Sequence, residues 1–243
     1  GYRAHSDSTF IEVSATNATG LKAGQNSGTQ SPVINNLFVR YDNSGTPYSG
    51  SVGLDVQTPD IQASNIRISW CDIGIKGTLA GQGHWSNVHV FSNNTGISGR
   101  WDGCHFNNVY LDSNFGWGMN LDHTYYFVAH GIYCWNNGAG IASTGGIRIS
   151  TDSGSSRRGK LRGVVLNDNV GTGLLLTGTC DQWDVECVLT KGSAAVVTTT
   201  GVQIDSGVTN TRLGLVGSDA TTALVNSSTS TSKTFPTGDV VGT

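Results

Sequence analysis

Apolar residues recur at two alternate positions in eight short runs along the chain, and each run follows a polar residue or a glycine that we take as its reference position. The eight reference residues are Asn36, Asn65, Asn87, Asn108, Gly131, Gly163, Asp184 and Arg212. One and three residues after these references, all sixteen positions are apolar or cysteine, although only 37% of the chain is hydrophobic. Alternation with a period of two is typical of a β-strand with one buried face, so we expect eight such strands.

The runs repeat every 21 to 32 residues, which is the range of solenoid proteins. Helical repeats would instead need apolar residues at i, i+3, i+4 and i+7, with less Gly, Asn, Ser and Thr. Six residues after the reference, four successive runs carry asparagines that can form a ladder: Asn93, Asn114, Asn137 and Asn169. A glycine and an apolar residue, as in Gly118-Met119 and Gly140-Ile141, then open a second strand, and a third leads into the next reference. This pattern predicts an all-β fold, a right-handed single-stranded parallel β-helix of about eight rungs with about three strands each.

The repeat divides the chain into three parts. Residues 33–218 form the parallel β-helix. Residues 1–32 are expected to be an N-terminal cap or linker, because an open solenoid end exposes strand edges and core. Residues 219–243, which include a polar Ser and Thr tract, are expected to be a C-terminal cap, a linker or a subunit contact.

Charge and cysteine content exclude several classes of function. The net charge is −3 and no basic stripe is present, so nucleic acid is not an expected partner. The apolar runs are too short to insert into a membrane, and no signal-peptide pattern is visible. The five cysteines fall mostly at inward positions and are expected to be free core thiols. Without Cys-x-x-Cys or His-x-x-x-His pairs, we expect no metal and no cofactor.

Aromatic side chains occupy outward positions in the middle of the repeat. Strands of a β-helix stack about 4.8 Å apart, and residues i and i+2 lie about 7 Å apart, so neighbouring outward residues form one patch. The patch comprises His89, Phe91, Tyr110, Asp112, Tyr133 and Trp135, with Arg67 beside it. Aromatic rings next to polar groups suit a sugar polymer, and they equally suit packing under a loop or against another copy of the chain.

Four acidic residues are candidates for catalysis. Asp112 is the acid inside the aromatic patch, and Asp168 lies two rungs away at about 10 Å, near the upper limit for an inverting glycosidase. Asp184 and Glu186 lie about 7 Å apart on one strand and form an alternative pair. For a lyase, a Tyr or His base beside an arginine is needed, and Arg67, His89 and Tyr110 occupy adjacent rungs.

The repeat, for example Asn87-Val88-His89-Val90 followed by Asn93-Asn94-Thr95-Gly96-Ile97, resembles the parallel β-helix of the pectate-lyase-like superfamily, and especially bacteriophage tailspikes. The catalytic motifs of polygalacturonases and pectate lyases are absent, so the resemblance assigns no catalytic residue.

The tailspike resemblance implies a homotrimer that binds a capsular or lipopolysaccharide glycan and often cleaves it as a glycosidase or lyase. It also implies a protein of the virion tail that is assembled in the bacterial cytoplasm and acts outside the cell. Three functions stay open: a depolymerase, a non-catalytic glycan-binding adhesin and a structural spike segment.

Overall fold

The chain is a parallel β-helix built from two sheets. The computed structural model describes residues 9–24, 31–41, 45–151, 156–190, 198–217, 220–229 and 232–234. Over these residues the regular structure consists of nineteen strands and contains no helix, and every strand pairing is parallel. Odd-numbered strands form a ten-stranded sheet and even-numbered strands a nine-stranded sheet.

The strands alternate between the two sheets along the chain. The odd sheet contains β1 (Thr9–Val13), β3 (Val33–Tyr41), β5 (Gln62–Ser69), β7 (His84–Phe91), β9 (His105–Asp112), β11 (Val128–Trp135), β13 (Lys160–Asn167), β15 (Asp184–Thr190), β17 (Arg212–Val216) and β19 (Ser232–Thr234). The even sheet contains β2 (Thr19–Ala23), β4 (Tyr48–Val56), β6 (Cys71–Gly81), β8 (Thr95–Asp102), β10 (Met119–Asp122), β12 (Gly145–Ser150), β14 (Thr172–Leu176), β16 (Thr198–Ile204) and β18 (Ala220–Asn226).

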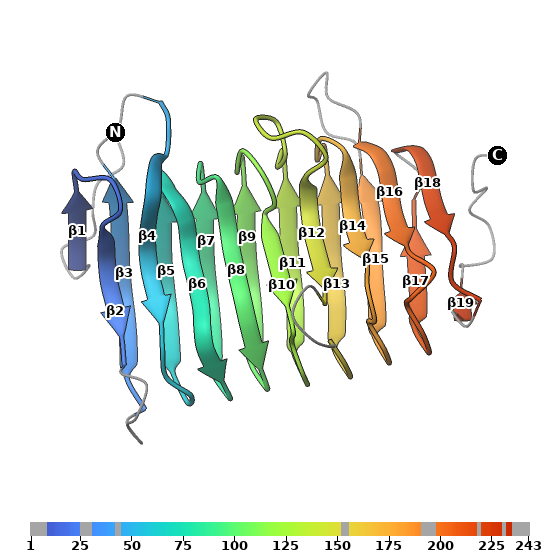
Figure 1. Ribbon diagram of the computed structural model, residues 1–243, viewed down its shortest axis with the longest axis horizontal. Helices are drawn as coiled ribbons and strands as arrows, with labels where there is room; N and C mark the ends of the chain where they lie inside the picture. The colour runs from blue at the N-terminus through green and yellow to red at the C-terminus, as the bar shows by residue number, and fades with distance from the viewer. Residues whose placement is uncertain are drawn as a thin grey trace.

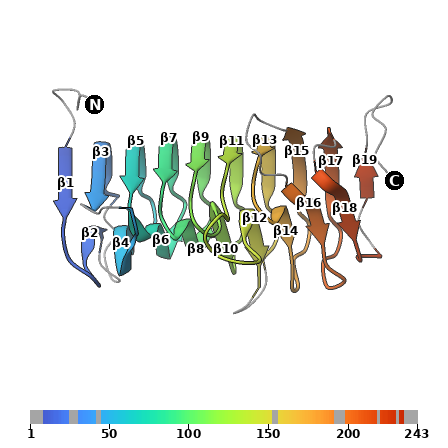
Figure 2. The ribbon, with the colours of Figure 1, turned by 90° about the horizontal axis from the view of Figure 1, so that it is seen from above.

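The coil is right-handed. As the chain advances from left to right in Figure 1, the even strands run down in front and the odd strands run up behind, and Figure 2 shows the two sheets as separate layers. This is the sense that parallel crossovers prefer, and it confirms the expected fold class. The rungs also continue on both sides of residues 33–218, because β1 and β2 lie before them and β18 and β19 after them.

Each rung has two strands rather than the three that the sequence pattern predicts. The expected third strand is the first half of an odd strand, and it continues through the reference residue into the expected first strand. The reference asparagines Asn36, Asn65, Asn87 and Asn108 have φ between 53° and 56°, and Gly131 and Gly163 also have positive φ. Because each of these rungs places a left-handed residue at the same position, the strands bend together and keep their pairing.

The interior between the sheets is apolar. All sixteen inward positions predicted from the repeat are buried, which confirms the alternating pattern. Trp85 and Phe106 also lie inside, with their rings stacked at a centroid distance of 5.3 Å. All five cysteines are buried and free, as expected, and burial raises the pKa of the Cys104 thiol to about 12.

A buried asparagine ladder runs along one corner of the coil. The side-chain amide of Asn93 donates to Asn114 Oδ1 at 3.1 Å, Asn114 donates to Asn137 at 2.8 Å, and Asn137 donates to Asn169 at 2.9 Å. All four side chains are fully buried, and the predicted ladder is confirmed. A second, exposed ladder joins the reference asparagines, for example from Asn108 to Asn87 at 2.8 Å.

Two details of the predicted alignment are wrong. The second strand after Asn137 is β12, in which Ile147 pairs with Met119, whereas Ile141 is 42% exposed in the preceding loop. In β15, Cys187 and not Val185 pairs with Val164. The cause is a bulge: two residues, Arg162 and Gly163, lie between the paired positions of β13 where β15 has only Glu186.

No helix that could cross a membrane is found in the part of the chain that the structure describes.

Candidate functional site

A row of rings and one guanidinium crosses the outer face of the odd sheet from β1 to β11. Strand pairing sets Phe10 beside Phe38, Phe38 beside Arg67, Arg67 beside His89, His89 beside Tyr110 and Tyr110 beside Tyr133. A second column, two residues along, sets Phe91 beside Asp112 and Asp112 beside Trp135. We call this surface the aromatic face; it comprises Phe10, Phe38, Arg67, His89, Phe91, Tyr110, Asp112, Tyr133 and Trp135.

Ring–ring and guanidinium–ring contacts link the aromatic face from Phe10 to Tyr133. The Phe10 and Phe38 ring centroids are 5.2 Å apart, and Arg67 Cζ lies 5.4 Å from the Phe38 centroid.

Arg67 Cζ also lies 5.5 Å from the Phe91 centroid, and the His89 ring is 4.6 Å from Phe91 and 6.0 Å from Tyr110. The Tyr110 and Tyr133 centroids are 5.4 Å apart. The sequence-based residues therefore come together as predicted, and Phe10 and Phe38 extend them toward the N-terminus.

Several members of the aromatic face are open to solvent. Tyr110 is 47% exposed and Trp135 is 38% exposed, both well above a core aromatic. The Tyr133 hydroxyl accepts a hydrogen bond from Asn167 Nδ2 at 3.0 Å, which fixes the ring. The face thus offers ring surfaces together with polar edges.

Asp112 lies in the middle of the aromatic face with two polar neighbours. Its Oδ1 accepts a hydrogen bond from the Ser113 hydroxyl at 2.6 Å. Its Oδ2 lies 3.8 Å from His89 Nε2, which is too long for a hydrogen bond. The side chains of His89 and Asp112 are 31% and 25% exposed, but the Nε2 atom of His89 is buried and has no hydrogen-bond partner among the described residues.

The structure does not place Asp168 on the aromatic face. Asp168 lies in the turn after β13 with a positive φ of 48°, and only 2% of the residue is exposed. On the intervening rung, Asn136 Nδ2 donates to Ser113 Oγ at 3.4 Å. Asp168 is therefore buried in a turn, whereas the side chain of Asp112 is 25% exposed on the aromatic face.

Asp184 and Glu186 lie near the C-terminal end of the odd sheet, where two arginines bind them. Arg212 donates to both oxygens of Asp184, from Nε at 2.8 Å and from Nη2 at 2.9 Å. Arg162 donates to Asp184 and, at 3.1 Å, to Glu186 Oε2. The hydrogen bonds and charge of Asp184 raise the pKa of Arg212. An acid whose oxygens are both bound by guanidinium groups is poorly placed to donate or accept a proton in catalysis.

Sequence reasoning missed Arg162 and Arg212 as partners of these acids. The signal was present, because Arg212 is the reference residue of its run and therefore pairs with Asp184 on the preceding run. Arg162 was hidden by the bulge in β13, which moves it next to Glu186.

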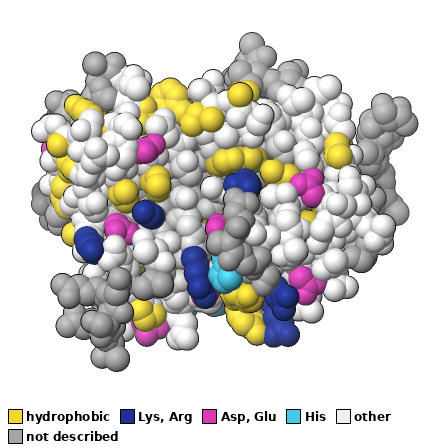
Figure 3. All heavy atoms as spheres, in the orientation of Figure 1, with side chains coloured by type: hydrophobic (Ala, Val, Ile, Leu, Met, Phe, Trp, Pro, Cys, Tyr) yellow, Lys and Arg dark blue, Asp and Glu magenta, His cyan; other side chains and the backbone are white. Residues whose placement is uncertain are grey.

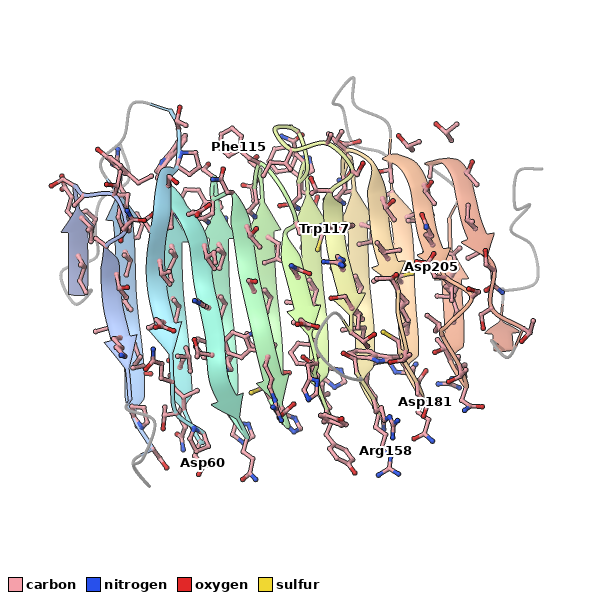
Figure 4. All side chains as sticks on the ribbon, in the orientation of Figure 1. Asp60, Phe115, Trp117, Arg158, Asp181 and Asp205 are labelled. Atoms are coloured by element: carbon pink, nitrogen blue, oxygen red, sulfur yellow. The ribbon has the colours of Figure 1, made fainter. Side chains whose placement is uncertain are left out.

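The remaining surface offers smaller clusters at the turns. Figure 4 shows Phe115 and Trp117 at one set of turns and Asp60, Arg158 and Asp181 at the opposite set. Arg158 stacks on the Tyr126 ring with Cζ 5.4 Å from its centroid and donates to Gln182 Oε1 at 3.0 Å. These contacts of Arg158 join neighbouring turns of the coil.

Among the described residues, the corresponding column on the outer face of the even sheet holds no ring and includes Asp55, Lys76, Ser98, Asn120, Arg148, Leu175, Gln203 and Val225. Figure 3 shows acidic, basic and apolar side chains interspersed on this side of the molecule. Over the described residues, no group of three or more His, Cys, Asp or Glu side chains could hold a metal ion. The aromatic face is accordingly the main candidate site.

No family model and no curated protein matches the chain, so the pectate-lyase-like superfamily is not confirmed. Among solved structures, the chain is similar to tailspike protein 3 of bacteriophage CBA120, with 11% sequence identity and a TM-score of 0.28. The match covers 94% of this chain and 49% of that tailspike, so the chain spans about half the length of the phage protein. A likeness this distant carries no argument about the site, and the parallel pairing of the strands themselves establishes the β-helix.

Proposed function

We propose that the aromatic face binds a capsular or lipopolysaccharide glycan of a bacterial surface, and that the chain belongs to a phage tailspike-like protein. The observation that supports this best is the unbroken row of ring contacts from Phe10 to Tyr133, with exposed Tyr110 and Trp135 beside Asp112. Aromatic faces accept the C–H surface of a sugar ring, and polar side chains nearby take its hydroxyl groups.

The shape of the aromatic face favours a polymer over a small ligand. Its side chains repeat at the strand spacing of about 4.8 Å and follow the long axis of the coil. A linear glycan can therefore place successive sugars over successive rungs. Exposed rings gathered on one face of a chain also commonly mark a binding surface.

The arrangement supports binding more directly than hydrolysis. A glycosidase needs two carboxyl groups that face one glycosidic bond. Asp168 is buried in a turn, and Asp184 and Glu186 are bound to arginines on other rungs. Asp112 is left as a single carboxylate that can accept hydrogen bonds from sugar hydroxyls.

Cleavage by elimination is the second candidate, favoured by the pairing of Arg67 with His89 and of His89 with Tyr110 on adjacent rungs. In such a reaction, His89 or Tyr110 would remove the proton next to a uronic carboxylate, and Arg67 would neutralise that carboxylate. The base keeps the proton, the C–H electron pair forms the carbon–carbon double bond as the bond to the glycosidic oxygen breaks, and that oxygen takes up a proton from water. The three side chains lie on adjacent rungs, as this chemistry requires.

An array of purified capsular and lipopolysaccharide glycans, probed with the labelled protein, tests the binding proposal. We expect Trp135→Ala to weaken binding about tenfold, which corresponds to the roughly 1.4 kcal/mol of one lost ring contact. Tyr126→Ala removes an aromatic residue that is 53% exposed but lies outside the aromatic face, so it should leave binding unchanged. A wild-type protein that binds no glycan, or a Trp135→Ala variant that binds normally, would favour a structural spike segment.

Product analysis on any bound glycan separates the enzymatic alternatives. New reducing ends with an ultraviolet-absorbing double bond indicate a lyase, new reducing ends alone indicate a glycosidase, and intact glycan indicates an adhesin. If cleavage occurs, Asp112→Asn should keep binding and lose roughly a hundredfold or more in rate. Cleavage at the wild-type rate by this variant would place the catalyst elsewhere.

A further inference from the structure

A hollow of about 290 Å³ lies on the outer face of the odd sheet across β13, β15 and β17. It opens where Gly214 on β17 pairs with Glu186 on β15, so that one rung carries a side chain and the next carries none. We call it the Gly214 hollow; the lining residues that matter below are Arg162, Asp184, Glu186, Arg212, Gly214 and Val216.

The Gly214 hollow is in line with the aromatic face. The column that contains Tyr133 continues through Val165 and Val188 to Val216, which lines the hollow. Three strand spacings separate Tyr133 from Val216, or roughly 14 Å along the coil. A glycan that follows the rings of the aromatic face therefore reaches the hollow without changing direction.

The backbone does not require a glycine at position 214. A Cβ atom there would meet Val185 O at 3.7 Å and Glu186 Cγ at 3.9 Å, which are ordinary van der Waals distances, and φ lies outside the left-handed region. Neither turn geometry nor close packing therefore requires a glycine at position 214. The glycine leaves an open space beside Val216.

The rim of the Gly214 hollow carries equal numbers of positive and negative side chains, and some of their hydrogen-bonding atoms are open to a ligand. Arg162 and Arg212 face Asp184 and Glu186, two positive charges against two negative ones. Asp184 is fully occupied by the arginines, whereas Glu186 accepts only through Oε2 among the described residues and its side chain is 56% exposed. Arg212 bonds through Nε and Nη2, which leaves the donors of Nη1 for a ligand.

A rim of this kind selects groups that both donate and accept hydrogen bonds. A carboxylate ligand would lie beside Asp184 and Glu186 and be repelled by them, and an ammonium ligand would meet two arginines. Adjacent hydroxyl groups of an uncharged sugar can donate to Glu186 and accept from Arg212 at once, while the ring packs on Val216.

From these observations we infer that the Gly214 hollow holds one neutral sugar residue of the glycan that lies on the aromatic face. This inference rests on the proposed function and adds the chemical class of one sugar and the residues that select it. Asp184 acts by positioning the two arginines, and Glu186 and Arg212 contact the sugar.

Filling the hollow tests the inference. Gly214→Leu should place a side chain in the hollow and weaken binding to the array glycans about tenfold or more, while Gly214→Ala, which fits without a clash, should have a smaller effect. Ser98→Leu adds the same side chain on the outer face of the even sheet and should not change binding. Circular dichroism spectra matching the wild type show that the variants are folded.

Glu186→Gln and the salt dependence of binding test the chemical class. A neutral sugar loses a charge-assisted hydrogen bond in Glu186→Gln, so binding should weaken, and the salt dependence of affinity between about 0.05 M and about 0.5 M NaCl should be the same in the wild type and in folded Gly214→Leu. A salt dependence that is steeper in the wild type than in Gly214→Leu, or affinity that rises in Glu186→Gln, would mean an acidic sugar in the hollow and overturn the assignment.

The two proposals fail in distinguishable ways. If Trp135→Ala loses binding while folded Gly214→Leu binds like the wild type, the hollow is outside the glycan path and the aromatic face remains the site. If neither variant changes binding to any array glycan, both proposals are wrong.

Discussion

The buried asparagine ladder should be a main source of the stability of this coil, and Asn114→Ala is the change that tests it. The Asn114 side chain takes part in four hydrogen bonds. Its Oδ1 accepts from the backbone amide and the side-chain amide of Asn93, both at 3.1 Å. Its Nδ2 donates to Val90 O at 3.1 Å and to Asn137 Oδ1 at 2.8 Å.

The cost of the substitution follows from which partners are left unpaired. Asn93 Nδ2 still donates to Phe91 O at 2.9 Å, and Asn137 Oδ1 still accepts from the Asn114 backbone amide at 3.1 Å. The backbone amide of Asn93 loses its acceptor in a fully buried site. The orphaned amide costs about 1–3 kcal/mol and each of the other three lost hydrogen bonds about 1 kcal/mol, so we expect a loss of about 4–6 kcal/mol. That is a large part of the 5–15 kcal/mol that typically stabilises a domain.

Urea unfolding, followed by tryptophan fluorescence and far-ultraviolet circular dichroism, measures this loss. Asn87→Gly is the matched control, because Asn87 also makes two ladder bonds, at 3.0 Å and 2.8 Å, but on the exposed surface. Glycine adopts the positive φ of 53° without strain, so this variant should lose no more than about 1.5 kcal/mol. An Asn114→Ala loss below about 1 kcal/mol, or equal to that of Asn87→Gly, would refute the reasoning.

Three further predictions concern the core, the thiols and the assembly. Val109→Asp should abolish folding, because it buries an unpaired charge at a fully buried position, whereas Tyr110→Asp on the exposed neighbour should fold; circular dichroism of both variants decides this. Burial raises the pKa of Cys104 from 9.0 to about 12, so the thiol's contribution to stability is complete below pH 9 and is lost as pH rises toward 12. Unfolding curves across this range should therefore shift less in Cys104→Ala than in the wild type, and equal shifts would contradict the assignment. Light scattering should give a mass near three times the 25.5 kDa of one chain, and a monomer at micromolar concentration would count against a trimer.

The fold could be predicted from the sequence because the same pattern of residues recurs in every rung, so that each run supports the alignment of the others. The inward positions are apolar in all eight runs, and the ladder asparagines recur at one fixed offset from the reference. The number of strands per rung was not readable, since a left-handed Asn108 looks like a turn in the sequence. In the structure it is a bend that both neighbouring rungs share, so the strand continues through it.

The candidate site was partly readable for the same reason. Outward side chains at the same position of neighbouring rungs must be neighbours once the register is right, and the pairing of His89 with Tyr110 and of Asp112 with Trp135 follows directly. The burial and the hydrogen-bond partners of the candidate acids could not be predicted from the sequence. The exposure of Asp168 depends on its place in a turn, which the alternation of the strand before it does not determine.

The register error at β15 shows how much of the site depends on one bulge. With Val185 aligned to Val164, Glu186 would follow Tyr133 and Val165 in the ring column and would be an acid at the end of the aromatic face. The bulge at Arg162 and Gly163 instead places Val188 in that column. Glu186 then stands beside Arg162 and above the space left by Gly214, so the same acid belongs to a charged rim and not to the row of rings. A carboxylate in the row would have argued for hydrolysis near Tyr133, whereas a carboxylate in the rim argues for recognition of sugar hydroxyls at the far end of the same path.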